Sequence, residues 1–150
     1  MPDWLNRRGL LFGSAALLSM KVAAMPRPTA AGMDLVEASA ATLARAMASG
    51  HASAEALVRA CQARIAALDR RGPRLNSVIE LNPDALAIAR ALDAERKAGR
   101  VRGPLHGLPV LLKDNIATGD RMSTSAGSLA LDGVRATRDA HLVTRLREAG

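Results

Sequence analysis

Residues 108–112 form an aliphatic run, Leu-Pro-Val-Leu-Leu, that ends at Lys113 and the polar pair Asp114 and Asn115. Side chains of a β-strand alternate between its two faces, and both faces of this run are apolar, which is typical of a strand buried on both sides. Such a strand needs a neighbour at each edge and further layers above and below it. We therefore expect the run to be an inner strand of a sheet.

The rest of the chain offers few partners for an inner strand. Residues 77–81, with Val78 and Ile79 adjacent, predict one further strand. Capping residues and glycine stops around apolar stripes predict helices over residues 39–50, 53–70, 82–99 and 139–150. The missing strands are expected beyond residue 150, so the chain is interpreted as the N-terminal portion of a larger α/β protein.

The first 31 residues predict an export signal. Arg7 and Arg8 precede an apolar stretch over residues 9–20, and small residues at 29 and 31, or at 22 and 24, offer cleavage positions. The stretch is shorter than the roughly 20 residues that a membrane-spanning helix needs. The arginine pair favours the twin-arginine route of bacteria over a general export signal or a membrane-tethered N-terminus. We expect a periplasmic or secreted protein, with no stable membrane span once the signal is removed.

Charge and composition after the signal exclude several classes of function. The formal net charge falls from +7 to +4, because four basic residues and one acidic residue lie in residues 1–31. The chain has no aromatic residue after Phe12 that could stack on a base, so a nucleic-acid partner is not expected. Cys61 is the single cysteine, which excludes a disulfide scaffold. The three histidines lack metal-site spacing and no phosphate-binding glycine loop is present, so no cofactor or metal is predicted.

Lys113 has two interpretations when the residues alone are considered. A lysine at the end of a strand is commonly the first exposed, charged residue as the chain leaves the core. A lysine held in a desolvated cleft has its charged form disfavoured and can act as a general base. Residue type favours the first interpretation, and the sequence around the lysine favours the second.

That surrounding sequence resembles a known family. The segments GPLHGLPVLLKDNI (103–116), MSTSAGSLAL (122–131) and DAHLVTRLREAG (139–150) resemble the start of the amidase signature domain, and ELNPDALAIARALDAERKAGRVRGPL upstream is similar to the family's lead-in. The resemblance covers about residues 34–150. It implies that residues 32–150 are the N-terminal portion of an α/β domain with a mixed central sheet surrounded by helices, helix-rich in this portion.

The resemblance also implies a reaction, the hydrolysis of a small-molecule carboxamide to a carboxylate and an amine or ammonia. Lys113 matches the lysine of the family's Ser, cis-Ser, Lys triad, which needs neither metal nor organic cofactor. The two catalytic serines and the oxyanion loop belong to a later segment, and Ser123, Ser125 and Ser128 come too early to match them. Those three serines are expected in turns. The 150 residues alone are therefore expected to be inactive.

The neighbours of Lys113 are candidates for supporting roles. Asp114 and Asn115 are expected to orient the lysine or hold the loop after it, or else to form a turn at the strand end. Gly127 suits a turn where the chain approaches the active site. His106 is expected to be a structural hydrogen-bonding residue.

Two alternatives to the hydrolase remain open from the sequence. The amidotransferase component that acts on charged tRNA looks similar around the lysine, but its work is cytoplasmic and the export signal argues against it. A truncated, non-catalytic scaffold or interaction protein would keep the fold without the serines. Nothing in the sequence indicates an oligomeric state.

Overall fold

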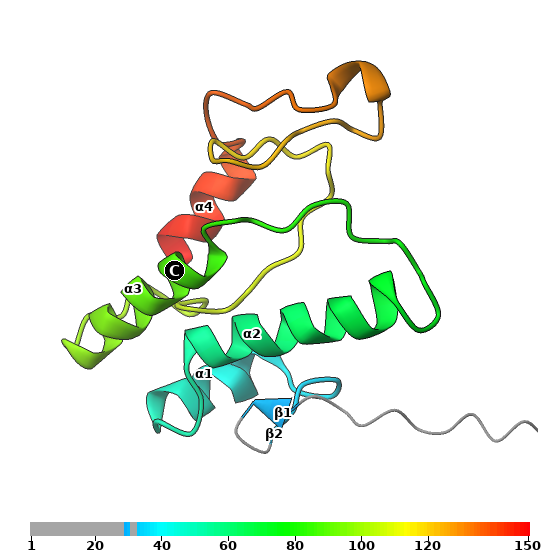
Figure 1. Cartoon of the computed structure of the whole chain (residues 1–150). Helices are drawn as coiled ribbons and strands as arrows, with labels where there is room; N and C mark the ends of the chain where they lie inside the picture. The colour runs from blue at the N-terminus through cyan, green and yellow to red at the C-terminus, as the bar shows by residue number, and fades with distance from the viewer. Residues whose placement is uncertain (1–28, 31–32) are drawn as a thin grey trace, which may run out of the picture.

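The computed structural model describes residues 29–30 and 33–150, and in this part the chain is mostly helix and irregular loop (Figure 1). The elements, in chain order, are the strands β1 (Thr29–Ala30) and β2 (Met33–Asp34), then the helices α1 (Ala40–Ala48), α2 (Ala54–Arg64), the π-helix η1 (Ile65–Arg70), α3 (Ala85–Lys97), the 3₁₀-helix η2 (Leu129–Leu131) and α4 (His141–Ala149). The predicted export signal lies almost entirely outside the described residues. None of the helices in the described part is long and apolar enough to cross a membrane.

The starts of α1 and α2 confirm the predicted caps. The hydroxyl of Ser39 accepts from the N–H of Thr42, and the hydroxyl of Ser53 accepts from the N–H of Ala56, each at 3.1 Å. Each contact satisfies a backbone N–H that has no partner inside the helix. Local sequence thus supplies a cap at each of these two helix starts.

The ends of α1 and α3 also follow the prediction. Gly50 and Gly99 follow these helices with φ of +79° and +77°, in the left-handed region that glycine enters without a steric penalty. Beyond α2, the chain continues as η1, a π-helix that the sequence pattern did not predict.

The starts of α3 and α4 differ from the sequence prediction. α3 begins at Ala85, after Asp84, rather than at residue 82. The predicted cap of α4 was Asp139, but the N-cap is Ala140, and no side chain in the described part of the chain caps that helix. The Asp139 carboxylate accepts instead from the N–H of Gly119, at 2.7 Å, and from Nε of Arg147, at 2.8 Å. A loop contact and an ion pair have taken the carboxylate away from the helix end.

The core lies where α1, α2 and α3 meet. Its buried cluster consists of Met47, Ala54, Leu57 and Ala89, and partly buried aliphatic side chains, including Leu108, pack against it. The carboxylate of Asp93 on α3 accepts from the N–H groups of Ala54 and Glu55 at 2.8 and 3.0 Å, and so caps α2 from a distant part of the chain. Helices α2 and α3 are therefore joined by both apolar packing and hydrogen bonds.

The two predicted strands are not formed in the described part of the chain, which corrects the sequence prediction. Residues 77–81 and 108–112 run as irregular coil (Figure 1), and the sheet among the described residues is the short antiparallel pair of β1 and β2. Ile79, Val110 and Leu111 are 61%, 53% and 75% exposed. A strand is defined by hydrogen bonds to a neighbour, and these segments have no such neighbour here. The apolar pattern of the two segments is present, but the partners that it needs are not.

Candidate active site

Lys113 lies where the aliphatic run ends and the chain turns. The N–H of Ile116 donates to the carbonyl of Lys113 at 2.9 Å, which closes a turn over residues 113–116. The side chain of Lys113 is exposed. Among the residues that the structure describes, none pairs with its amine, and they do not enclose it in the expected desolvated cleft.

The loop that follows is tied to Asp114, the next residue. The Asp114 carboxylate accepts from the hydroxyl of Ser125 at 2.5 Å, from the N–H of Ser125 at 3.4 Å and from the N–H of Gly127 at 3.3 Å. Its own carbonyl accepts from the N–H of Ala126 at 3.4 Å. The Ser125 hydroxyl, followed by the N–H groups of this loop, holds the pKa of Asp114 below its usual range. Of the roles considered for Asp114, the geometry matches that of holding the loop.

Residues 125–128 form a tight turn with an unusual backbone. The N–H of Ser128 donates to the carbonyl of Ser125 at 2.9 Å, and the two central residues, Ala126 and Gly127, have φ of +50° and +77°. Two consecutive positive φ values are the signature of a type I′ turn. Gly127 adopts a positive φ without a steric penalty, as predicted. Ala126 adopts one at a steric cost, because it carries a Cβ atom.

Asn115 stands apart from this arrangement. Its side chain is exposed and, within the described residues, forms no hydrogen bond. The structure thus brings Asp114 and Gly127 together near Lys113 and leaves Asn115 out. Ser125 has a turn role, as the sequence predicted, because its hydroxyl donates to the Asp114 carboxylate.

His106 is a buried anchor of the segment that leads into the lysine. It is 2% exposed, its Nε2 lies 2.9 Å from the carbonyl of Leu92, and its Nδ1 accepts from the N–H of Arg102 at 3.2 Å. Because Nδ1 accepts, the ring proton is on Nε2 and is donated to Leu92. The prediction that His106 is a structural hydrogen-bonding residue is confirmed.

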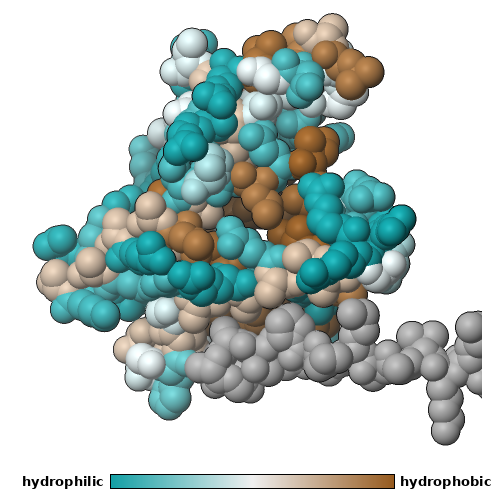
Figure 2. Space-filling model, viewed as in Figure 1, coloured by the Kyte–Doolittle hydropathy of each residue, from teal (hydrophilic) through white to brown (hydrophobic). Residues whose placement is uncertain are grey.

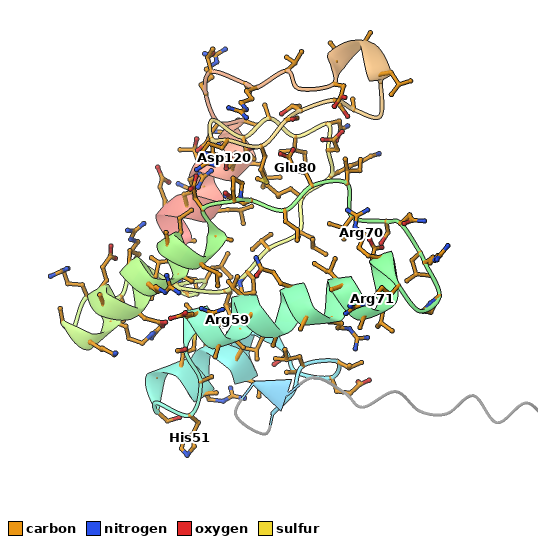
Figure 3. The ribbon with its side chains drawn as sticks, viewed as in Figure 1. His51, Arg59, Arg70, Arg71, Glu80 and Asp120 are labelled. Atoms are coloured by element: carbon orange, nitrogen blue, oxygen red, sulfur yellow. The ribbon has the colours of Figure 1, made fainter. Side chains whose placement is uncertain are left out.

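The structure adds two carboxylates that sequence reasoning did not single out, Glu80 and Asp120 (Figure 3). Glu80 accepts from the N–H of Ser123 at 2.7 Å. Asp120 accepts from Thr118, Met122 and Arg147 at 2.9, 3.0 and 2.9 Å. Burial raises the pKa of Asp120, but hydrogen bonds from these three groups outweigh it and leave the pKa lowered. The two carboxylates hold the polar loop to residues 77–81 and to α4, contacts that leave no local signal in the sequence.

No group of three or more potential metal ligands occurs among the residues that the structure describes. The hydroxyl of Thr124, in the loop held by Asp114, is buried and has no hydrogen-bond partner among the described residues. Figure 2 shows hydrophobic surface over η2 at the top and in the middle of the same face, and the exposed side chains of Leu129, Ile79 and Leu111 are among the large apolar ones in this half of the molecule.

Known proteins share the sequence and the fold of this chain over part of their length. The family model described as Amidase matches residues 56–150. The chain is 58% identical to the native peptide amidase from Stenotrophomonas maltophilia, whose structure superposes with a TM-score of 0.73 over 76% of this chain and 23% of that one. It is 51% identical over 89 residues to a protein of Arthroderma benhamiae whose name describes an amidase, matching 59% of this chain.

A second kind of relative matches a larger share of the chain than the Arthroderma protein does. A glutamyl-tRNA(Gln) amidotransferase component from Pseudomonas syringae is 46% identical over 111 residues, which is 73% of this chain and 22% of that protein. The chain spans only 15% of the Arthroderma protein. The similarity therefore concerns one limited part of each relative.

Proposed function

Because the chain belongs to the amidase family, we propose that the full-length protein hydrolyses a carboxamide to a carboxylate and an amine or ammonia, with Lys113 as its general base. The observation that carries the proposal is the motif of residues 103–116. It lies inside the matched region and ends in a turn that presents the amine of Lys113 free of any ion pair to the described residues.

The proposed chemistry is a proton relay. Neutral Lys113 accepts a proton from a middle serine, which accepts one from the serine whose oxygen attacks the amide carbonyl. The proton returns along the same path to the leaving amine, and water then releases the acid from the acyl-serine. Both serines and the backbone N–H groups that stabilise the oxyanion come from segments outside these 150 residues. The oxyanion contacts of such a site are worth about 3–4 kcal/mol each.

Exposed apolar side chains support a proposal about the fold of the full-length protein. Ile79, Val110 and Leu111 lie on the two segments with strand-like sequence and are more than half exposed. We propose that these segments become strands of a mixed central sheet when the rest of the protein supplies their neighbours. The added layers would also exclude water around Lys113, and that desolvation favours the neutral amine over the charged ammonium.

The proposed role of Lys113 as general base is tested by the substitution Lys113→Ala in the full-length protein. Ammonia release is measured on a panel of aliphatic, aryl and peptide amides, the last included because of the similarity to a peptide amidase. We expect kcat to fall by at least about 1,000-fold, as for loss of a general base in a serine triad. Lys97→Ala, at an exposed position in the last turn of α3, is the matched control and should retain activity.

Equal activity of Lys113→Ala and the parent protein would reject the proposed base. Activity of residues 1–150 alone would reject the part of the proposal that places the serines elsewhere. If neither the full-length product nor this chain hydrolyses any amide, the non-catalytic scaffold becomes the better interpretation.

A tRNA-dependent amidotransferase is the second candidate function, and the identity of 46% to the Pseudomonas syringae protein favours it. The arginine pair in NRRGLLFG (6–13) favours the exported amidase. Cell fractionation of the full-length product separates the two candidates. We propose a periplasmic or secreted enzyme, and recovery of the protein in the cytoplasm together with tRNA-dependent amidation would support the second candidate instead.

A further inference from the structure

The hydrogen bonds of Asp114 reach a single short stretch of chain. Its two carboxylate oxygens and its carbonyl receive donors from three consecutive residues, Ser125, Ala126 and Gly127. These residues are more than ten positions away in the sequence. Asp114 is covalently joined to Lys113, so whatever fixes Asp114 also restricts the backbone that holds the lysine.

The stretch held by Asp114 is strained. Ala126 has a φ of +50°, a region that a residue with a Cβ atom occupies only at a steric cost. Strained backbone of this kind persists where surrounding contacts over-determine it, and it occurs preferentially at functional sites. Here the surrounding contacts are those of Asp114.

The same loop has a second anchor that does not lead to the lysine. Glu80 accepts from the N–H of Ser123 at 2.7 Å, and the N–H of Thr124 donates to the carbonyl of Val134 at 2.9 Å. These contacts hold the loop to other segments. Loop anchoring as such is thus shared by several residues, whereas the link to Lys113 runs through Asp114, whose shortest contact is the one with the Ser125 hydroxyl.

We propose that Asp114 and Ser125 are a positioning pair for Lys113. The short contact between the Ser125 hydroxyl and the Asp114 carboxylate fixes the strained turn of residues 125–128 against the turn of residues 113–116. The backbone of Lys113 is thereby held in one orientation while its amine accepts and returns the proton. The inference rests on the proposed function, since it concerns the same lysine.

The pair also assigns a chemistry to Ser125. Its hydroxyl hydrogen is committed to an ionised carboxylate, and its oxygen accepts from the N–H of Gly127 at 3.2 Å. The Ser125 hydroxyl thus bonds to Asp114 and within its own turn, and among the described residues it has no hydrogen bond to the amine of Lys113. Ser125 is a positioning residue and not a catalytic one.

The test uses the full-length protein and the variants Ser125→Ala, Asp114→Asn, their combination and Ser125→Thr. A misplacement of about 1 Å at a catalytic group can cost about 100-fold in rate. We expect each single loss of the contact to lower kcat by roughly 10- to 100-fold with KM within about twofold. The double variant should be no slower than the slower single variant, because the two single variants remove the same contact, the one between the Ser125 hydroxyl and the Asp114 carboxylate. Ser125→Thr, which keeps a hydroxyl, should restore most of kcat.

Glu80→Ala is the matched control, because it also removes an anchor of the loop. It should lower the melting temperature like Ser125→Ala but leave kcat within about twofold. Wild-type kcat in Ser125→Ala, additive losses in the double variant, or an equal loss in Glu80→Ala would overturn the proposal. If Asp114→Asn does not fold, Ser125→Ala and Ser125→Thr decide the question between them.

Lys113→Ala, assayed in the same series, separates this inference from the proposed function. If Lys113→Ala retains activity, the general base is misassigned and both proposals fail. If Lys113→Ala is inactive while Ser125→Ala and Asp114→Asn behave as wild type, only the positioning pair is rejected.

Discussion

Gly107, in the motif that leads to Lys113, should tolerate no side chain. Its φ is +83°, and a Cβ atom at this position would lie 2.9 Å from Cβ of Ala54 and 3.5 Å from Sδ of Met47. Ala54 is 1% exposed and its Cβ is fixed to the first turn of α2, so it cannot swing aside. We therefore predict that Gly107→Ala destabilises the protein by two separate effects.

The two effects can be separated with Gly99. Gly99 has nearly the same backbone, φ +77°, but a Cβ there would meet no described atom within 4 Å. Gly99→Ala should therefore cost only the left-handed conformation, about 1–2 kcal/mol. Gly107→Ala should cost that amount plus the overpacking of a filled site, typically about 1–3 kcal/mol. The expected total for Gly107→Ala is about 2–5 kcal/mol.

The assay is urea unfolding of both variants beside the parent protein, with the free energy of unfolding obtained by linear extrapolation. The quantity that matters is the difference between the two variants, because the conformational cost cancels in it. A difference near zero would refute the close approach of residue 107 to α2. It would also remove the reason for glycine in this part of the lysine motif.

Two further predictions concern residues of α2, one in the core and one in an ion pair. Leu57 is 1% exposed, so Leu57→Ala should lower the free energy of unfolding by about 2–5 kcal/mol, whereas Leu57→Met, which conserves volume, should cost less than about 1.5 kcal/mol; equal urea midpoints for the two variants would contradict this. Hydrogen bonds from Arg90 and then Arg59 lower the pKa of Glu55 from 4.5 to about 2. The folded-state pKa is depressed, so the contribution of Glu55 is complete above pH 4.5 and is lost as pH falls toward 2; the stability difference between the parent protein and Glu55→Gln should shrink over that interval, and a constant difference would contradict the linkage.

Features that depend on neighbouring residues were predictable from the sequence. The caps at Ser39 and Ser53 and the left-handed glycines after α1 and α3 were predicted correctly, because each involves atoms three or four residues apart. The start of α4 was predicted wrongly because the Asp139 carboxylate accepts from Gly119, in a distant loop, and from Arg147, and helix signals reveal neither partner. Local signals thus predict a contact only when no distant group competes for it.

The candidate site also has some features that the sequence predicted and others that it did not. The motif around Lys113 indicated the family and the candidate base, and Gly127 was predicted to lie in a turn, since these depend on residue types at fixed spacing. The partner of Asp114 was not predicted, because Ser125 is only one of several serines in the loop that could have met the carboxylate. Glu80 had no signal at all, as its acceptor role depends on two segments meeting in space.

The sequence by itself determined the helices with local caps, the apolar pattern of residues 77–81 and 108–112, and the lysine motif that identifies the amidase family. Tertiary structure decided which carboxylate binds which loop, and whether an apolar segment becomes a strand. A helix satisfies most of its backbone hydrogen bonds within itself, so local sequence signals cover most of what it needs. A strand takes its hydrogen bonds from a neighbour, and residues 108–112 remain coil here because pattern alone supplies no neighbour.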